Sequence, residues 1–244
     1  MTVDLAATFG LGPRELVAFT GGGGKTSLLL NLGRQLTGRG DRVIITTTTK
    51  LGLDQTDGIE VCWAIDWYEI ESALDRGGPV FVLSESDEHK VLGYEPEVVE
   101  DLYRDSSAGY VLVEADGSRR RPLKAPAEHE PVVPGAASVV VVVMGVDAIG
   151  RTIFEASHRP ARAAELAGRA ETDVITPEVA AAVLTHPEGG LKGIPPAARV
   201  IVAITKVTDQ TAAAAATIAT LVGLSRRIVS VVSIPYDPVV ARGG

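Results

Sequence analysis

The sequence predicts a three-layer α/β protein built on a mostly parallel sheet. Apolar runs rich in β-branched residues alternate with amphipathic segments along almost the whole chain. This alternation is typical of a parallel sheet that helices cover on both faces. A glycine-rich loop, residues 21–24, joins the first clear apolar run to the amphipathic segment after it. No linker of distinct composition interrupts the pattern, so residues 1–244 are expected to form a single domain.

The first half of the chain supplies most of the expected strands. Residues 42–47 are almost continuously apolar and β-branched, as buried parallel strands are. Gly38 and Gly40 end the preceding helix, and Pro96 fits the first turn of another. Residues 85–90 are expected to form a charged loop. In order, the expected elements are a helix over 4–9, a strand over 16–19, a helix over 25–36, strands over 42–47 and 59–63, a helix over 67–74, a strand over 79–83, a helix over 96–103 and a strand over 110–113.

The second half opens with a proline-rich connection over 119–135, whose length inside a compact domain indicates a functional role. Thr176, Pro177 and Glu178 have the cap, proline and acid of a helix start. The expected elements are a strand over 137–144, helices over 160–167 and 179–184, a strand over 200–204, a helix over 211–222 and a strand over 228–232.

Composition and charge exclude several function classes. A formal charge of −8 argues against a general binder of nucleic acid or anionic membranes, and 45% hydrophobic residues allow a sizeable core. The single cysteine, Cys62, excludes an internal disulfide and a cysteine-based zinc cluster. Residues 1–12 lack the pattern of a signal peptide, and the apolar run 139–146 is too short to cross a bilayer. We therefore expect a cytoplasmic protein that binds neither nucleic acid nor membrane.

The stretch 19–27 has the features of a phosphate-binding P-loop. A buried strand, four glycines and a helix follow one another, and such a loop turns backbone N–H groups towards a phosphate at a helix N-terminus. Lys25 would reach the β- and γ-phosphates, and the Thr26 hydroxyl would hold Mg²⁺. Phe19 stands where the pattern G-x-x-x-x-G-K-[ST] has its first glycine, and a glycine-rich turn without a ligand is the alternative. The predicted phosphate-binding residues are Gly21, Gly22, Gly23, Gly24, Lys25, Thr26 and Ser27.

Polar side chains also follow the second expected strand. Thr48, Thr49 and Lys50 come directly after its apolar run. Ligands of open α/β sheets bind beyond the carboxyl ends of the strands, so these side chains are expected to face a phosphate or a Mg²⁺-bound water. The alternative is that the threonines only fill a strand, for which their branched side chains are suited.

Two carboxylates, Glu114 and Asp116, follow the strand over 110–113. P-loop enzymes use a carboxylate in this place to hold Mg²⁺ or its water shell. The predicted metal site therefore consists of Thr26, Glu114 and Asp116, and the two acids are also predicted to position Mg²⁺ or the attacking water. Which acid lies nearer the metal is left open.

A basic segment comes next, with Arg119, Arg120, Arg121 and Lys124. A guanidinium binds phosphate oxygens in a bidentate manner, so Arg119 or Arg120 is predicted to stabilise charge during catalysis. A solvated loop is the alternative interpretation. His129 lies in the same connection, but no second histidine completes a zinc motif, and a structural role is the default. The residues assigned to catalysis are Lys25, Glu114, Asp116 and Arg119.

The segment 205–209 is similar to the N-K-x-D element with which G-domains bind guanine. Thr205 replaces the asparagine, and Asp209 comes one residue late. Lys206 is expected to stack on a nucleotide base, and Asp209 is the weaker candidate for base recognition. The choice between ATP and GTP stays open.

Taken together, these motifs resemble those of the YqeC family, described as accessory proteins of selenium-dependent molybdenum hydroxylases. The most specific part is the run from 114 to 134. The motifs are also similar to those of the SIMIBI branch of P-loop proteins, whose members tolerate a residue other than glycine at the first P-loop position. The matching segments are 17–26, 46–50, 113–118, 122–126, 129–131, 145–147 and 158–159.

The expectation is thus a P-loop NTPase fold and Mg²⁺-dependent hydrolysis of ATP or GTP. The resemblance implies a molybdenum hydroxylase, or a protein that matures its cofactor, as partner. One alternative is a kinase or nucleotidyltransferase that acts on a small-molecule cofactor, with the threonines and the arginine segment binding the acceptor. Another is a nucleotide-gated binding protein that does not hydrolyse the nucleotide.

Overall fold

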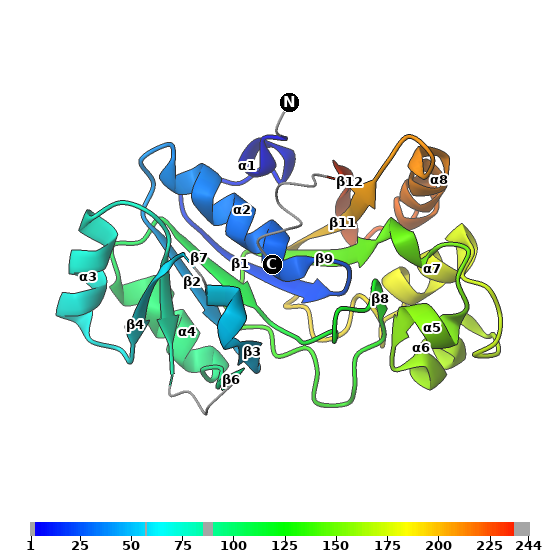
Figure 1. The fold of residues 1–244 in the computed structure, drawn as a ribbon, viewed down its shortest axis with the longest axis horizontal. Helices are drawn as coiled ribbons and strands as arrows, with labels where there is room; N and C mark the ends of the chain where they lie inside the picture. The colour runs from blue at the N-terminus through cyan, green and yellow to red at the C-terminus, as the bar shows by residue number, and fades with distance from the viewer. Residues whose placement is uncertain (1–2, 57, 85–89, 237–244) are drawn as a thin grey trace.

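A computed structural model describes residues 3–56, 58–84 and 90–236 of the chain. In this described part, eight strands form one central sheet, and every neighbouring pair runs parallel (Figure 1). The expected mostly parallel α/β sheet is confirmed. The order across the sheet is β12 (Ile228–Pro235), β11 (Arg199–Val207), β9 (Val139–Gly145), β1 (Glu15–Gly21), β7 (Tyr110–Glu114), β2 (Val43–Thr47), β5 (Val80–Leu83) and β4 (Glu60–Trp63).

Helices cover both faces of this sheet and make it the middle of three layers. Successive strand residues point to opposite faces, so Val111 and Val113 join one hydrophobic core and Leu112 joins the other. The core containing Leu112 is closed by α1 (Leu5–Thr8) and α2 (Lys25–Thr37). The opposite core is closed by α3 (Trp67–Asp75), α4 (Pro96–Asp105), α5 (Ile153–Ala156), α6 (Pro160–Ala167), α7 (Pro177–Thr185) and α8 (Ala212–Val222).

The strand register brings the polar ends of three strands together. Strand β7 lies between β1 and β2. Its last residue, Glu114, is level with Phe19 of β1 and with Thr47 of β2. The glycine loop leaves β1 two residues later and leads directly into α2. The motifs that follow three separate strands therefore meet at one edge of the sheet.

Most expected helices and strands are present, with ends shifted by a few residues. The additional elements are short. The pair β3 (Leu51–Gly52) and β6 (Lys90–Val91) is antiparallel, and β8 (Leu123–Lys124) pairs with β10 (Ser157–His158) in parallel. Two-residue strands carry no periodicity in the sequence, so only tertiary contacts define them. Turns of 3₁₀ helix occupy Leu53–Thr56 and Val146–Ala148. The charged loop expected over 85–90 lies outside the described residues at 85–89.

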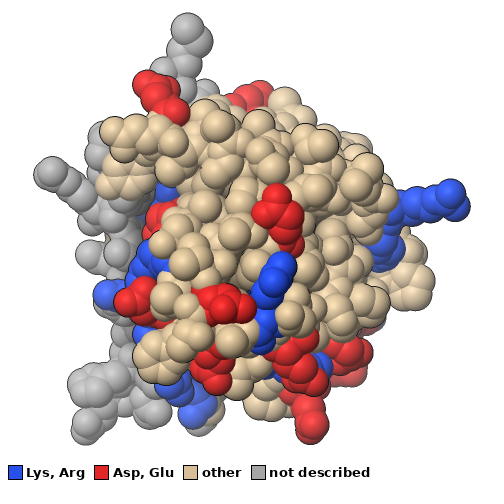
Figure 2. All heavy atoms as spheres, turned by 90° about the vertical axis from the view of Figure 1, so that its right-hand side faces the viewer, with Lys and Arg blue, Asp and Glu red and all other residues tan. Residues whose placement is uncertain are grey.

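The surface around α5 to α8 mixes charges of both signs. In the view onto this side, acidic and basic side chains lie scattered among a larger uncharged area (Figure 2). No helix within the described ranges is long and apolar enough to cross a membrane.

The packing of the central strand predicts a large effect for one substitution. Leu112 is fully buried in β7, on the face that α2 covers. Leu112→Ala should lower the free energy of unfolding by about 3 kcal/mol, because the change removes buried methyl groups and leaves a cavity. Urea unfolding measures this value. The control is Leu224→Ala, whose side chain is 77% exposed and should change stability by less than about 0.5 kcal/mol. Equal effects of the two substitutions would contradict the described core.

Candidate functional site

The glycine loop has a backbone conformation and a packing that only glycine allows. Gly21, Gly23 and Gly24 have φ values of +93°, +78° and +108°, a region that other residues rarely adopt. A Cβ atom at Gly23 would lie 2.0 Å from the backbone nitrogen of Gly145. The loop therefore packs directly against the backbone of neighbouring segments. Cβ atoms at Gly21 and Gly22 would likewise lie 2.3 Å from the Val143 carbonyl oxygen and 2.4 Å from the Arg121 carbonyl oxygen.

Three of the predicted phosphate-binding amides already have acceptors inside the protein. The N–H of Gly21 donates to Asp116 Oδ2 at 2.9 Å. The N–H groups of Gly22 and Gly23 donate to the carbonyls of Val143 and Arg121, at 2.8 and 3.0 Å. The first N–H groups of a helix have no acceptor within the helix. The backbone N–H groups that remain for a phosphate are therefore those of residues 24–27, at the start of α2.

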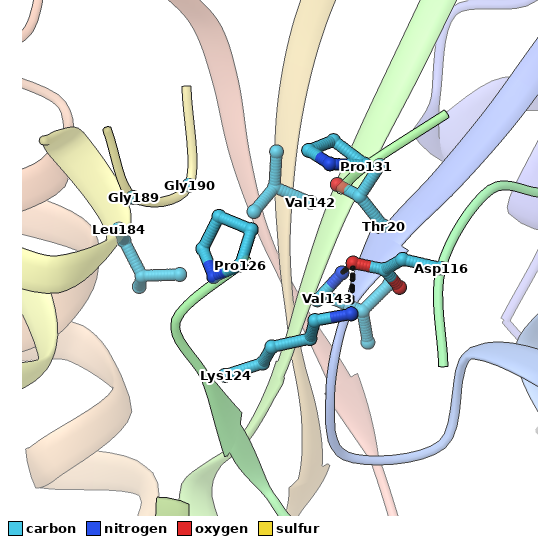
Figure 3. Close-up of a pocket in the computed structure, with 11 residues that line it drawn as sticks. Thr20, Asp116, Lys124, Pro126, Pro131, Val142, Val143, Leu184, Gly189 and Gly190 are labelled. Carbon is cyan, nitrogen blue, oxygen red and sulfur yellow. Dashed lines mark hydrogen bonds and ion pairs between the residues drawn. The ribbon is translucent and has the colours of Figure 1, made fainter. Parts of the chain in front are cut away.

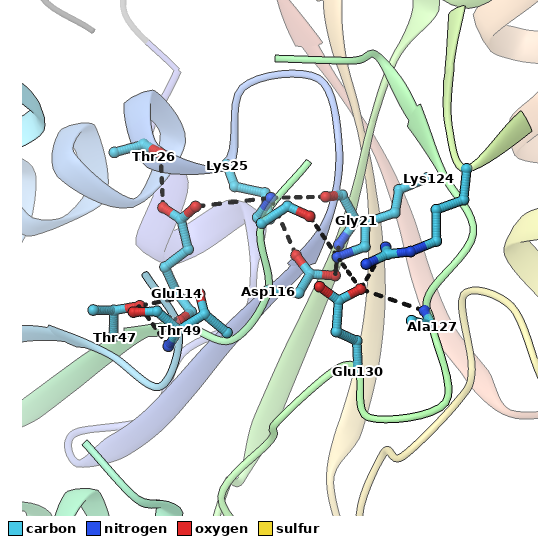
Figure 4. A network of polar contacts seen from close by, with 12 residues as sticks. Gly21, Lys25, Thr26, Thr47, Thr49, Glu114, Asp116, Lys124, Ala127 and Glu130 are labelled. Atoms are coloured by element: carbon cyan, nitrogen blue, oxygen red, sulfur yellow. Dashed lines mark hydrogen bonds and ion pairs between the residues drawn. The ribbon is translucent and has the colours of Figure 1, made fainter. Parts of the chain in front are cut away.

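Lys25 is the buried cation at the centre of the site. Its side chain is 2% exposed. Its Nζ donates to the Gly21 carbonyl at 2.7 Å and lies 3.1 Å from Asp116 Oδ1 and 3.8 Å from Glu114 Oε1 (Figure 4). Burial acts to lower the pKa of Lys25, but the carboxylates of Asp116 and Glu114 outweigh it and raise the pKa above its usual value. Lys25 is thus held in its charged form.

Glu114 is the carboxylate next to the Thr26 hydroxyl. The Thr26 Oγ1 donates to Glu114 Oε2 at 2.7 Å, and Gln55 Oε1 lies 3.2 Å from the same hydroxyl. Burial raises the pKa of Glu114, although nearby Lys25 acts in the opposite direction. A hydroxyl and a carboxylate are hard oxygen donors of the kind that Mg²⁺ prefers. Thr26 and Glu114 therefore fit the predicted metal site by the chemistry of their donor atoms.

Asp116, the second predicted metal residue, has different neighbours. Its Oδ2 accepts the Gly21 N–H and lies 3.0 Å from Lys124 Nζ, while its Oδ1 is in ion-pair contact with Lys25. The side chain is 2% exposed. The carboxylate thus contacts two ammonium groups and one amide. Of the two acids, it is Glu114 that contacts Thr26.

The charged contacts continue beyond Asp116 into the proline-rich connection. Lys124 Nζ lies 3.0 Å from Glu130 Oε2, which lies 2.6 Å from Arg159 Nη1. Burial lowers the pKa of Lys124. Burial acts to raise the pKa of Glu130, but Lys124 and Arg159 lower it to about 2. Sequence reasoning placed Lys124 with the arginines and missed the roles of Glu130 and Arg159. The signal was their presence in the family motifs 122–126, 129–131 and 158–159.

The threonine hydroxyls at the end of β2 and just beyond it have partners within the protein. Thr47 Oγ1 donates to the Glu114 carbonyl at 2.9 Å, and Thr48 Oγ1 donates to the Val132 carbonyl at 2.7 Å. Thr49 Oγ1 lies 3.4 Å from Thr47 Oγ1. These hydroxyls tie the end of β2 to the end of β7 and to the proline-rich connection. Lys50 has an exposed side chain beyond them.

Arg119 and Arg120 occupy a strained turn against the glycine loop. Both are exposed and have positive φ values, +48° and +60°. The Arg121 N–H donates to the Ser118 carbonyl at 2.9 Å, which makes 118–121 a type I′ turn, whose central positions favour glycine and asparagine. For a residue other than glycine, a positive φ value costs about 1–2 kcal/mol of conformational energy. The Arg121 carbonyl accepts the Gly23 N–H, so the turn that carries the two arginines is bonded to the loop. His129 is exposed.

The carboxyl end of β11, which extends beyond the expected strand over 200–204, also reaches the glycine loop. Thr205 Oγ1 donates to the Gly23 carbonyl at 2.5 Å. Lys206 pairs with Asp147 at 2.9 Å, and its backbone has a positive φ of +59°. Asp209 is exposed, three residues further along. The structure therefore brings Thr205 and Lys206 to the predicted site.

A small cavity lies between the end of β1 and α7 (Figure 3). Thr20, Asp116 and Lys124 supply its polar wall, and Pro126 and Leu184 lie opposite. The hydroxyl of Thr20 is buried and finds no hydrogen-bond partner among the described residues. Within those residues, no group of three or more His, Cys, Asp and Glu side chains is arranged to hold a metal ion.

The chain is similar to known proteins in sequence and in fold. The family described as "YqeC protein" matches residues 17–161. The Escherichia coli (strain K12) protein named "Uncharacterized protein YqeC" is 32% identical over 191 residues, which cover 75% of this chain and 73% of that protein. A chain of the MinC:MinD cell division protein complex from Aquifex aeolicus has a similar fold, with a TM-score of 0.54 and 14% identity. That alignment covers 94% of this chain and 86% of the other, and the expected three-layer P-loop NTPase fold is confirmed.

The packing of the glycine loop predicts that Gly23→Ala lowers the free energy of unfolding by more than the strain of a positive φ value would by itself. Both Gly23 and Gly40 have positive φ, +78° and +89°, but a Cβ atom at Gly40 would meet no atom within 4 Å. Gly40→Ala should therefore lose about 1–2 kcal/mol in urea unfolding from conformational strain. Gly23→Ala should lose more, because it adds a clash with the backbone of Gly145. Equal losses would show that the loop is not packed as described.

The environment of His158 predicts a pH dependence of stability. Burial, assisted by Arg159, lowers the pKa of His158 to about 4 from its ordinary 6.5. As the pH falls from 6.5 to 4, the unfolded chain takes up a proton at His158 that the folded chain does not, so stability should decrease. Urea unfolding at pH 7 and pH 5 should show a smaller decrease for His158→Gln than for the wild type. His129→Gln removes an exposed imidazole and should keep the wild-type decrease.

Proposed function

The chain belongs to the YqeC family, and from that premise we propose that it is a Mg²⁺-dependent P-loop NTPase that binds ATP or GTP at the start of α2. The observation that carries the proposal is the meeting of Lys25, Thr26 and Glu114. Lys25 and Thr26 open the helix, and Glu114 ends the neighbouring strand, with Thr26 Oγ1 and Glu114 Oε2 2.7 Å apart. A phosphate-binding lysine, a metal-binding hydroxyl and a strand-end carboxylate are the parts that P-loop NTPases use.

The phosphates bind at the N-terminus of α2. The amides of residues 24–27 and the positive end of the helix dipole attract the negative oxygens. Lys25 turns from the carboxylates towards the β- and γ-phosphates. Gly21, Gly22 and Gly23 contribute by shaping the loop, because their own amides have acceptors in the protein.

Thr26 and Glu114 would hold Mg²⁺ beside the bound phosphates. When bound, the ion neutralises charge that develops on the phosphates during transfer. Glu114 holds the ion or one of its waters, because it is the acid in contact with Thr26. Asp116 acts on Lys25 instead, through the contact at 3.1 Å.

The remaining predicted residues surround the phosphates and the base. Arg119 and Arg120 stabilise the negative charge that develops on the phosphate, since their turn is bonded to the loop through the Arg121 carbonyl. Lys206 stacks on the base, with Asp209 beside it. Thr48, Thr49 and Lys50 follow the end of β2, where a phosphate acceptor or a partner protein would contact the bound nucleotide.

The cellular role that fits the family resemblance is the maturation of a molybdenum hydroxylase in the cytoplasm. Nucleotide binding and hydrolysis would time the delivery or activation of the client or its cofactor. This role rests on the family resemblance, whereas the nucleotide chemistry rests on the site itself.

Removal of the central cation tests the proposal. Lys25→Met should abolish binding of ATP and GTP in calorimetry with Mg²⁺, because the phosphates lose their buried counter-charge. The wild type should bind ATP or GTP, and this binding should weaken when Mg²⁺ is left out. It should also release phosphate without any added acceptor. Phosphate release only in the presence of a small-molecule acceptor would indicate a kinase. Tight binding without release would indicate a nucleotide-gated binding protein.

A matched variant separates lost binding from a general change in charge. Lys192→Met also removes one positive charge, but Lys192 Nζ contacts only the connection 127–128 and Glu188 among the described residues. Its nucleotide affinity should equal that of the wild type. Far-UV circular dichroism checks that Lys25→Met is folded. Unchanged affinity in a folded Lys25→Met protein would exclude a nucleotide site at the glycine loop.

A further inference from the structure

We propose that Asp116 competes with the nucleotide phosphates for Lys25, and that Lys124, held by Glu130, sets the strength of this competition. The inference rests on the proposed nucleotide site and assigns a positioning role to two residues outside it. Four side chains carry the argument, and their contacts form one continuous chain from Lys25 through Asp116 and Lys124 to Glu130 (Figure 4).

Asp116 contacts the ammonium group that a phosphate would need in this loop. One of its oxygens accepts the Gly21 N–H at 2.9 Å, and the other lies 3.1 Å from Lys25 Nζ. The loop lysine is the side chain that reaches the β- and γ-phosphates in such sites. The lysine must leave Asp116, at least in part, to reach a phosphate. The Asp116 carboxylate and the nucleotide phosphates therefore compete for the Lys25 ammonium.

Lys124 decides what happens to Asp116 when Lys25 leaves. Asp116 is 2% exposed, so water cannot replace a lost cation at its carboxylate. A buried charge without a partner is strongly destabilising. Lys124 Nζ stays 3.0 Å from Asp116 Oδ2 and is itself 1% exposed. With Lys124 in place, Asp116 keeps a counter-charge, and Lys25 is released more easily.

Glu130 limits how much of Lys124 is available to Asp116. The Lys124 ammonium also lies 3.0 Å from Glu130 Oε2 and donates to the Gly117 carbonyl at 2.5 Å. Glu130 has a second cation, since Arg159 Nη1 lies 2.6 Å away. The three cations Lys25, Lys124 and Arg159 balance the three anions Glu114, Asp116 and Glu130. A change of charge at Lys124 or Glu130 should therefore alter how tightly Asp116 holds Lys25.

A double-mutant cycle with Asp116 tests this role. The affinities for ATP and GTP with Mg²⁺ are measured by calorimetry for the wild type, Lys124→Met, Asp116→Asn and the double variant. Lys124→Met should weaken binding by about tenfold, because Asp116 then keeps Lys25. In the Asp116→Asn background the same change should alter affinity by less than about twofold, since no carboxylate competes. An undiminished effect in that background would overturn the inference and indicate direct contact of Lys124 with the nucleotide.

A second variant serves if Lys124→Met does not fold, which thermal unfolding will show. Glu130→Gln keeps both lysines and lets Lys124 turn fully to Asp116. It should tighten nucleotide binding by about threefold, and Asp116→Asn should remove this gain. Weaker or unchanged binding in a folded Glu130→Gln protein would overturn the inference.

The control and the wild type separate this inference from the proposed function. Lys192→Met changes the net charge by the same amount as Lys124→Met. The Lys192 ammonium contacts the connection at residues 127–128 and does not contact Asp116. The Lys192→Met variant should bind nucleotide with wild-type affinity, and a loss equal to that of Lys124→Met would overturn the inference. If the wild type binds neither ATP nor GTP, the proposed function fails and this inference fails with it. Binding by the wild type with no difference between the cycle's two backgrounds would overturn the inference alone.

Discussion

The candidate site depends on one constraint, the burial of charged groups that must keep partners. Lys25, Glu114, Asp116 and Lys124 are all nearly inaccessible to water. Each isolated charge would be strongly unfavourable there, so the groups are stable only as a connected set with alternating sign. The cluster is therefore sensitive to the arrival of another anion. A triphosphate bound as proposed would become the partner of Lys25 and would leave Asp116 with Lys124.

The parallel sheet is what makes this cluster possible. Strands β1, β2 and β7 end at the same edge, and their register places Glu114 level with both neighbours. The helix α2 starts from that edge with Lys25 and Thr26. The connection 115–134 returns across the same edge and adds Lys124 and Glu130 to it. A fold with antiparallel neighbours would send these strand ends to opposite sides of the molecule.

Local strain gathers around the same place. Among the described residues, five that are not glycine have positive φ values: Ala64, which follows β4 away from the site, and the four residues Arg119, Arg120, Arg159 and Lys206. Such conformations persist only where the surroundings determine them, and they cluster at functional sites. All four are cations on segments that contact the glycine loop or the charged cluster. These strained backbone conformations therefore hold positive charge beside the glycine loop and the charged cluster.

The sequence by itself determined the fold class and predicted the main residues of the candidate site. Long apolar β-branched runs, such as 139–145, predict parallel strands because burial on both faces requires them. The four glycines followed by Lys25 and Thr26 predict a phosphate loop because their spacing is local. Only the tertiary structure decided which acid serves which partner, since Glu114 and Asp116 are two residues apart and look equivalent in sequence. It also decided that Lys124, Glu130 and Arg159 join the cluster, and that the two-residue strands exist. These features depend on contacts between segments distant along the chain, which no local pattern encodes.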